Sequence, residues 1–138
     1  MSASILRASL VLGLMNLVIP FAIDMYVPAL PAISDDLGVP VSATQLTLLA
    51  FFVTFGVGQL LYGPIADMFG RKRPLYFGLV LYGLASLGCA FSTSIEMLIA
   101  LRVLQGAGAA AVASIPRAIV RDQFTGNAAT RVMATIML

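Results

Sequence analysis

Long apolar runs separated by short polar breaks dominate the chain, and their lengths predict helices that cross a membrane. A helix needs about 20 apolar residues to cross a bilayer. Four runs meet or approach this length, at residues 6–27, 42–67, 75–91 and 95–121, and a fifth run begins at residues 128–138. The pattern therefore predicts an all-α membrane protein with four transmembrane helices plus the start of a fifth.

Prolines set the expected end of the first helix. Proline removes a backbone donor and bends or stops a helix. We expect a kink at Pro20 and a stop at Pro28 and Pro31, followed by a polar connection at residues 32–41. The first crossing should therefore end near residue 27.

Capping signatures set the beginnings of the later helices. A Ser or Thr followed three residues later by Gln or Glu forms a capping box, which satisfies free backbone N–H groups at a helix start. Ser42 with Gln45 and Thr93 with Glu96 have this spacing. Pro74 suits the first turn of the third helix, because its missing N–H would be unpaired there in any case.

The composition agrees with a bilayer as the solvent. Hydrophobic residues make up 60% of the chain, charged residues only 10%, and the mean hydropathy is +1.01. Soluble domains carry about a quarter charged residues. The formal net charge of +2 is too small for a nucleic-acid surface, so the expected partner is the lipid bilayer and no nucleic acid.

The residue inventory gives no sign of catalytic chemistry. The chain has no histidine, and Cys89 is its single cysteine, so neither a metal-ligand cluster nor a disulfide framework is expected. Cys89 is interpreted as a small packing residue. No nucleophile–base pair or phosphate loop is apparent, and we therefore expect a protein that is not an enzyme and has no metal or other cofactor.

The distribution of cations predicts the orientation. Cytoplasmic loops of membrane proteins carry an excess of Lys and Arg. Seven of the eight cations fall on one side under the predicted alternation, namely Arg7, Arg71, Lys72, Arg73, Arg117, Arg121 and Arg131. We expect a multi-pass protein of the cytoplasmic (inner) membrane with its N-terminus inside, and a first helix that is retained rather than cleaved as a signal peptide.

Two charges lie inside predicted membrane segments. Asp24 is near the outer end of the first helix and Arg102 is near the outer end of the fourth, at similar depth. Charges inside a membrane are costly and normally face a cavity. The pair could share an ion pair or a cavity in which Asp24 binds a proton or a cationic group. Alternatively, Asp24 could lie at the headgroup level and Arg102 could extend outward to it.

The turn after the second helix combines glycines with opposite charges. Gly63, Asp67, Gly70 and Arg71 follow one another at spacings of four, three and one residues. Asp67 at a helix C-terminus opposes the helix dipole, so cations should offset it. The hypothesis is a cytoplasmic latch of Asp67, Arg71 and Asp122, with Arg73 at hand. The alternative is a topology signal only, which would explain the cations but not the spacing.

Small residues recur along the fourth helix. Gly106, Ala110 and Ser114 are four residues apart, and Gly108 lies between the first two. Such stripes let membrane helices approach closely. We predict packing roles for Gly106, Gly108 and Ala110, and expect the same of Gly56, Gly58 and Gly63 on the second helix.

Three segments together resemble a known family. The loop at residues 63–75 is similar to the signature loop of the major facilitator superfamily, residues 24–31 resemble a first-helix motif of its drug:proton antiporters of the bicyclomycin-resistance type, and residues 102–108 resemble their fourth-helix motif. One departure is Met68, where many members have a basic residue. The chain, residues 1–138, would be a partial N-terminal transmembrane half of a twelve-helix transporter.

The resemblance implies roles for particular residues. Asp24, Tyr26, Arg102 and Gln105 match the motifs linked to proton or substrate coupling. A second group matches the gating loop and its acidic partner: Gly63, Asp67, Gly70, Arg71, Arg73 and Asp122. The implied activity is efflux of small amphipathic drugs by alternating access, driven by a proton gradient, with the C-terminal portion of the transporter as a partner.

Two other functions stay open at the level of the sequence. The length also fits a small four-helix exporter that works as a dimer, with one acidic residue in its first helix. A membrane assembly or regulatory subunit derived from a transporter is a third possibility. A continuation of the chain beyond Leu138 would favour the large transporter.

Overall fold

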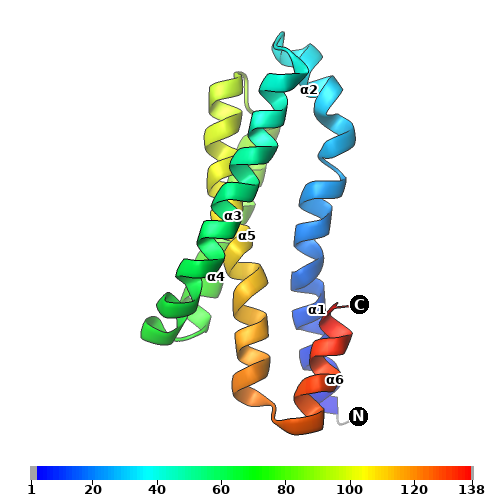
Figure 1. The fold of residues 1–138 in the computed structure, drawn as a ribbon, viewed down its shortest axis with the longest axis vertical. Helices are drawn as coiled ribbons and strands as arrows, with labels where there is room; N and C mark the ends of the chain where they lie inside the picture. Colours follow the sequence, from blue (N-terminus) through cyan, green and yellow to red (C-terminus); the bar gives the residue numbers. More distant parts are fainter. Residues whose placement is uncertain (1–2, 138) are drawn as a thin grey trace.

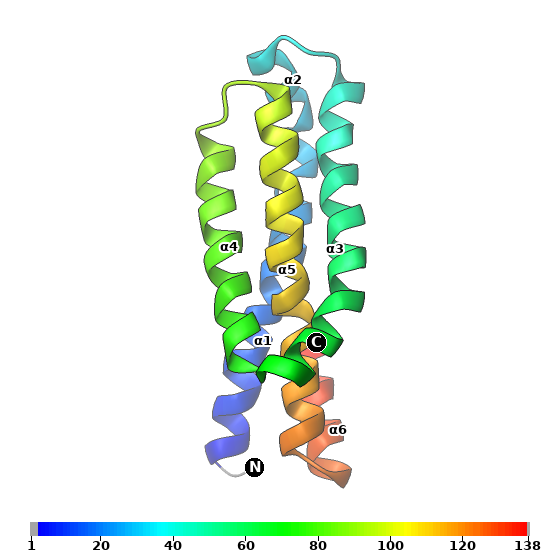
Figure 2. The same cartoon turned by 90° about the vertical axis from the view of Figure 1, so that its left-hand side faces the viewer.

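A computed structural model describes residues 3–137 as an elongated helical bundle (Figure 1). The helices run alternately up and down the long axis, and connections at the two ends join them (Figure 2). The described elements are α1 (Ala3–Asp24), a 3₁₀ turn η1 (Val27–Ala29), α2 (Leu30–Leu37), α3 (Val41–Phe69), α4 (Lys72–Ala90), α5 (Ile95–Gln123) and α6 (Gly126–Met137). The all-helical prediction is confirmed for the described residues.

The first apolar run continues as helix further than predicted. α1 passes through Pro20 and ends at Asp24, and the chain then forms η1 and α2. The prediction of a polar connection at residues 32–41 is wrong, because α2 extends to Leu37. Pro28 and Pro31 each occupy the first turn of a new helical segment, where a proline needs no N–H partner. Gly38, with φ of 63°, ends α2.

The capping residues also differ from those expected. α3 begins at Val41 after Pro40 and has no side-chain cap, so the capping box at Ser42 is wrong. At α5 the cap is Ser94 rather than Thr93, and its Oγ accepts a hydrogen bond from the backbone N–H of Met97 at 3.2 Å. The path of the backbone between α4 and α5 places Ser94, rather than the adjacent Thr93, at the start of α5.

The third and last helices begin earlier than expected. α4 begins at Lys72, so Arg73 and Pro74 both lie in its first turn, and it ends at Ala90. α6 begins at Gly126, with φ of 59°, rather than at residue 128. Leu138, the last residue of the predicted fifth segment, lies outside the described residues.

Three candidate membrane spans, rather than four, meet the requirements of length and apolarity among the described residues. They are Ala3–Leu37, Val41–Phe69 and Ile95–Gln123. α4, which has 19 residues and carries Lys72 and Arg73 in its first turn, is not among them. The count of four complete spans is therefore corrected to three by this criterion, with α4 lying antiparallel beside α5 (Figure 2).

α5 forms the centre of the bundle and packs against both α3 and α4. Its residues from Ala109 to Ala113 are fully buried. A second cluster joins α1, α5 and α6 through Leu12, Val120 and Val132. By contrast, many large apolar side chains on α1, α3 and α4 are exposed, as Leu60 is at 78%. These outward apolar faces suit contact with lipid or with further helices.

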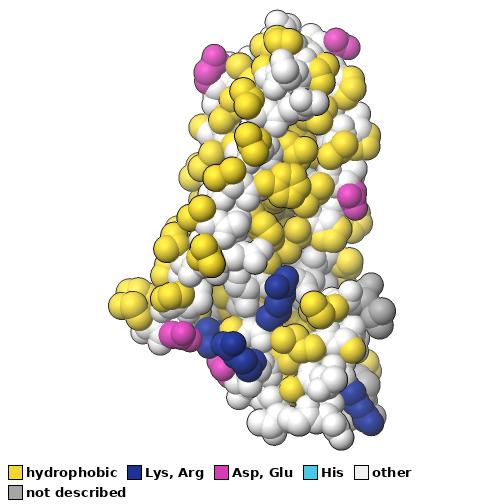
Figure 3. Space-filling model, viewed as in Figure 1, with side chains coloured by type: hydrophobic (Ala, Val, Ile, Leu, Met, Phe, Trp, Pro, Cys, Tyr) yellow, Lys and Arg dark blue, Asp and Glu magenta, His cyan; other side chains and the backbone are white. Residues whose placement is uncertain are grey.

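The charges are segregated along the bundle. The space-filling view shows Lys and Arg side chains only toward the lower end on this face, whereas acidic side chains lie at both ends and also partway along the right-hand edge (Figure 3). This agrees with the predicted clustering of cations. The position of the N-terminus relative to a membrane stays a prediction.

Candidate functional site

Arg102 is a buried cation held between two aromatic rings. Its residue is 2% exposed, and its guanidinium carbon lies 4.0 Å from the ring centroid of Tyr26 and 4.4 Å from that of Phe51. Both distances are within the ~6 Å range of cation–π attraction. The α1–η1 connection and α3 therefore supply π faces around a charge that α5 carries, and this offsets part of the cost of burying it.

A chain of hydrogen bonds orients the guanidinium. The Nη1 of Arg102 donates to Gln105 Oε1 at 2.5 Å, and Gln105 Nε2 donates to Ser86 Oγ at 2.9 Å. The Ser86 hydroxyl in turn donates to the carbonyl of Tyr82 at 2.7 Å. Gln105 lies one helical turn after Arg102, so the pair shares a face of α5. The cation is thereby tied to α4.

Tyr26 has a second anchor on α3. Its hydroxyl forms a hydrogen bond with Thr47 Oγ1, and Thr47 is fully buried. Thr47 Oγ1 also donates to the carbonyl of Thr44. The ring over Arg102 is therefore fixed by a polar contact at its far end as well as by the guanidinium.

The cluster borders a cavity of about 450 Å³ between α1, η1, α4 and α5. Its lining includes Tyr26, Tyr82, Ser86, Arg102 and Gln105, and no acidic side chain from the described part of the chain. Nε and Nη2 of Arg102 are buried and have no hydrogen-bond partner among the described residues. The site thus presents a positive charge and donor groups that the surrounding protein leaves partly unsatisfied.

Asp24 does not join this cluster, and the ion pair with Arg102, one of the possibilities that the sequence leaves open, is absent from the described structure. Among the residues described, the two ion pairs are both formed by Arg71. Asp24 is the last residue of α1, it is exposed, and it does not line the cavity. A similar depth in the membrane does not predict contact between Asp24 and Arg102, because two residues at the same depth can lie on different faces of their helices. The role of Asp24 in coupling stays a prediction.

Sequence reasoning missed several members of the site. Phe51, Thr47, Ser86 and Tyr82 all contribute, yet each lies in an apolar helix without any charge nearby. Only the spacing of Thr44, Thr47 and Phe51 could have drawn attention, since residues three and four apart share a helix face. Nothing in the sequence shows that this face meets Arg102.

A second charged cluster lies where α3, α4 and α5 approach at the cation-rich end. Arg71 Nη2 lies 2.9 Å from Asp67 Oδ1, and Arg71 Nε donates to Asp122 Oδ2 at 2.9 Å. Gly70 between Asp67 and Arg71 has φ of 84° and ψ of 171°, a conformation that favours glycine. The structure thus brings together the three charged residues of the hypothesised latch, and their role as a gate stays a prediction.

Two other residues assigned to the gating loop stand apart from these ion pairs. Gly63 is exposed, and a Cβ added to it would meet no described atom within 4 Å. It borders a small cavity together with Asp67 and Arg71. Arg73 is exposed on α4 and forms no ion pair within the described residues. The described structure therefore gives no packing contact to Gly63 and no ion pair to Arg73.

The small residues of α5 lie at close helix contacts. A Cβ on Gly106 would be 2.6 Å from the carbonyl oxygen of Phe51, and one on Gly108 would be 2.6 Å from that of Gly78. Ala110 is fully buried, and its Cβ faces Gly58. Gly56 and Gly63 differ, because in the described structure both have open space where a side chain would be. The packing role expected of these two glycines therefore has no contact to support it among the described residues.

Comparison with known proteins identifies the family. The Major Facilitator Superfamily model matches residues 12–138. The chain is 41% identical over 133 residues to an uncharacterised MFS-type transporter of Bacillus subtilis, covering 96% of this chain and 33% of that protein.

Two further relatives have names that refer to drug resistance. A chloramphenicol resistance protein of Pseudomonas aeruginosa is 38% identical over 97% of this chain, and a bicyclomycin resistance protein homolog of Haemophilus influenzae is 36% identical over 94%. The chain spans about a third of the length of each of these relatives. On these matches, the chain belongs to the major facilitator superfamily.

Proposed function

We propose that this chain is the N-terminal part of a proton-coupled transporter that exports small amphipathic drugs by alternating access. One observation carries the proposal: Arg102, a buried cation without a carboxylate partner among the described residues, borders a cavity between helices. Ionisable groups inside a membrane are costly, and where present they mark substrate or ion pathways. The names of the relatives supply the class of cargo.

In this proposal, Arg102 supplies a fixed positive charge at the outer half of the bundle. Gln105 orients it, and the ring of Tyr26 covers it from the side of the cavity. An arriving group that accepts hydrogen bonds would compete with these contacts. A ligand shifts the equilibrium between two conformations of a transporter only if it binds one of them more tightly. Cargo that displaces the contacts of Arg102 in one conformation would therefore favour that conformation.

Asp24 is the proposed proton-binding group. It is the only acidic residue in the first 34 residues and ends the first long helix. Its exposed side chain leaves the carboxylate accessible to the remainder of a longer transporter. Protonation removes a charge that is costly to enclose, and therefore favours a state in which this surface is covered.

The cluster of Asp67, Arg71 and Asp122 is the proposed gate at the cytoplasmic end. One ion pair, between Arg71 and Asp122, joins the α3–α4 connection to the last turn of α5, and a second, between Arg71 and Asp67, holds Arg71 to the end of α3. Its partners are partly exposed, with 65% of the Asp67 side chain and 47% of the Asp122 side chain accessible. Exposed pairs are weak, so a conformational change can break and re-form this contact.

Drug efflux driven by a pH gradient tests the proposal. Asp24→Asn in the transporter that contains this segment should abolish gradient-driven efflux while leaving gradient-independent binding of the drug. Asp35→Asn is the matched control, because Asp35 lies in α2 beyond the cavity and should retain efflux. Retained gradient-driven efflux in Asp24→Asn would remove Asp24 from the mechanism. Efflux lost equally in both variants would point to a general defect.

A further inference from the structure

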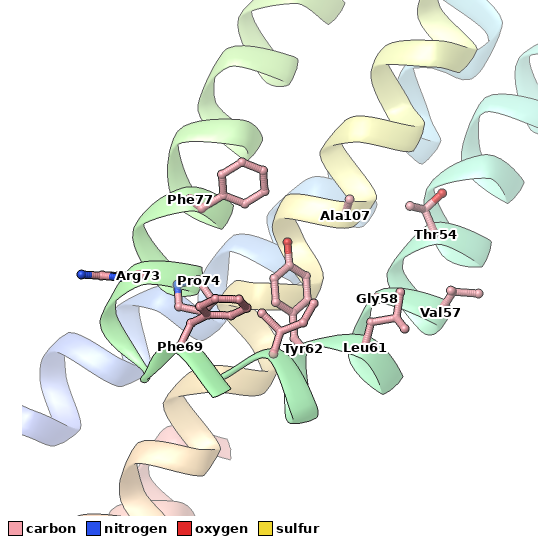
Figure 4. Close-up of a pocket in the computed structure, with 11 residues that line it drawn as sticks. Thr54, Val57, Gly58, Leu61, Tyr62, Phe69, Arg73, Pro74, Phe77 and Ala107 are labelled. Atoms are coloured by element: carbon pink, nitrogen blue, oxygen red, sulfur yellow. The ribbon is translucent and has the colours of Figure 1, made fainter. Parts of the chain in front are cut away.

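An apolar groove runs between α3 and α4 on the outer side of the bundle (Figure 4). Both helices pack mainly on α5 and make few contacts with each other, so a furrow of about 440 Å³ lies between them, with Ala107 of α5 at its base. Its α3 lining extends from Thr54 to Phe69. Fifteen residue steps correspond to about 22 Å. The groove is therefore long enough to follow an acyl chain through one leaflet, which is about half of the ~30 Å core.

The described lining of the groove offers few groups that would orient a polar ligand. Apart from Arg73 at one end, its side chains are hydrocarbon except for the hydroxyls of Thr54 and Tyr62, and the Thr54 hydroxyl already donates to the carbonyl of Ala50 at 2.8 Å. Sites for drug-sized ligands combine apolar walls with a few placed polar groups. This furrow therefore suits a plain hydrocarbon chain better than it suits the cargo.

One end of the groove carries an uncompensated cation. Arg73 lines this end from the first turn of α4, and its guanidinium extends outward, away from the furrow (Figure 4). Its neighbour Arg71 pairs with both Asp67 and Asp122. Within the described residues this leaves Arg73 without an acidic partner, at the end of the bundle where cations gather.

We propose that the α3–α4 groove binds an anionic phospholipid, with one acyl chain between Leu61 and Phe77 and the phosphate at Arg73. The apolar walls of the groove would contact the acyl chain, and the guanidinium of Arg73 would attract the anionic headgroup. A Lys or Arg near an anionic membrane surface contributes about 1 kcal/mol, which corresponds to about a fivefold preference. The site concerns the lipid environment, and it stands whether or not the chain transports drugs.

Tryptophan quenching by brominated lipids tests the site directly, because the chain contains no tryptophan. Phe77→Trp places the reporter in the groove. Tyr76→Trp is the matched control, since Tyr76 is 63% exposed against 62% for Phe77 but does not line the groove. Each variant is made in the transporter that contains this segment, with any tryptophan outside these 138 residues replaced by phenylalanine. It is reconstituted in vesicles of phosphatidylcholine and phosphatidylglycerol, with the bromine on the acyl chains of one lipid or the other.

The expected result is a quenching preference for phosphatidylglycerol of about fivefold in Phe77→Trp and near unity in Tyr76→Trp. Arg73→Gln added to Phe77→Trp should abolish the preference. Lys72→Gln, which removes an adjacent cation outside the groove, should leave most of it. Circular dichroism of each variant checks that the helices are retained.

Leu61→Trp, with Leu60→Trp as its control, repeats the measurement from α3 if Phe77→Trp does not fold. Equal preferences at groove and control positions would overturn the proposal. So would a groove tryptophan that no brominated lipid quenches, because a protein segment would then cover the groove.

Discussion

Arg102 and Arg71 are two arginines held in opposite ways. Arg102 is 2% exposed, has no carboxylate partner in the described part of the chain, and lies between two aromatic rings. The side chain of Arg71 is 20% exposed and has two carboxylates at 2.9 Å. The buried arginine is held by packing and the partly exposed one by charge.

The two kinds of contact suit different roles. Exposed ion pairs are worth about 0–1 kcal/mol and weaken in salt, so the Arg71 cluster can open and close at little cost. A buried charge without a counter-ion is costly, and well-packed apolar residues of similar volume often replace buried charges without loss of stability. Arg102 is therefore expected to serve function rather than stability, whereas the Arg71 cluster is expected to serve movement.

The largest effect should follow replacement of the buried cation. Arg102→Met keeps much of the apolar stem of the side chain and removes the charge. We expect drug efflux to fall to background, while thermal stability in detergent stays within about 1 kcal/mol or rises. Efflux assays and thermal unfolding on the same preparation check this. Retained efflux, or a large loss of stability with loss of efflux, would contradict a functional rather than structural role for this arginine.

The next effect should come from the packing that holds the rings. A Cβ at Gly106 would lie 2.6 Å from the carbonyl oxygen of Phe51, whose ring covers Arg102. Gly106→Ala should therefore displace Phe51 and destabilise the bundle by about 1–3 kcal/mol. Gly56→Ala is the matched control, because no described atom lies within 4 Å of a Cβ there. Equal melting temperatures for the two variants would show that the close contact is easily relieved.

A smaller effect is expected at Tyr26. Tyr26→Phe keeps the ring over Arg102 and loses only the hydrogen bond to Thr47. The expected loss of stability is about 0.5–1.5 kcal/mol, with efflux reduced rather than abolished. Thr47→Val removes the same bond and also the bond from Thr47 to the carbonyl of Thr44, so the double variant should show no loss beyond that of Thr47→Val alone. Additive losses would mean that the hydroxyls act separately.

The smallest effects on stability should be at the exposed cluster. Asp122→Asn should cost about 0–1 kcal/mol, and Asp67→Asn about 0.2–0.5 kcal/mol as an i,i+4 pair. Both losses should shrink as salt is raised. Cysteine-accessibility labelling at the cation-rich end should nevertheless shift in Asp122→Asn, because the ion pair between Arg71 and α5 is lost. Unchanged labelling would argue against a gate.

Much of the fold could be predicted from the sequence, since long apolar runs have few alternatives to helix in a membrane. The errors were at ends and connections. Pro28 and Pro31 were interpreted as stops, although a proline in a first turn allows a new helix to begin. The third apolar run forms α4, which begins earlier than predicted and is not among the three candidate spans.

The candidate sites were predictable to different degrees. Asp67 and Arg71 are close in sequence, so their pairing follows from helix geometry and a tight glycine turn. The partners of Arg102 come largely from other helices or turns, and no local rule connects Phe51 or Ser86 to it. The sequence leaves open an ion pair between Asp24 and Arg102, because position along a helix sets the depth of a residue but not the direction of its side chain. The described structure has no such pair.

The order of residues alone predicts a helical membrane protein with its cations gathered toward one end. The length of an apolar run and the position of a charge are local properties, which do not depend on how the helices pack. The motifs of the chain also indicated the family. Only the tertiary structure decided that Arg102 lies between two rings rather than beside Asp24, and that α3 and α4 diverge to leave a groove ending at Arg73. Those features depend on the rotation of each helix about its axis, which the close contacts of Gly58, Gly106 and Gly108 set.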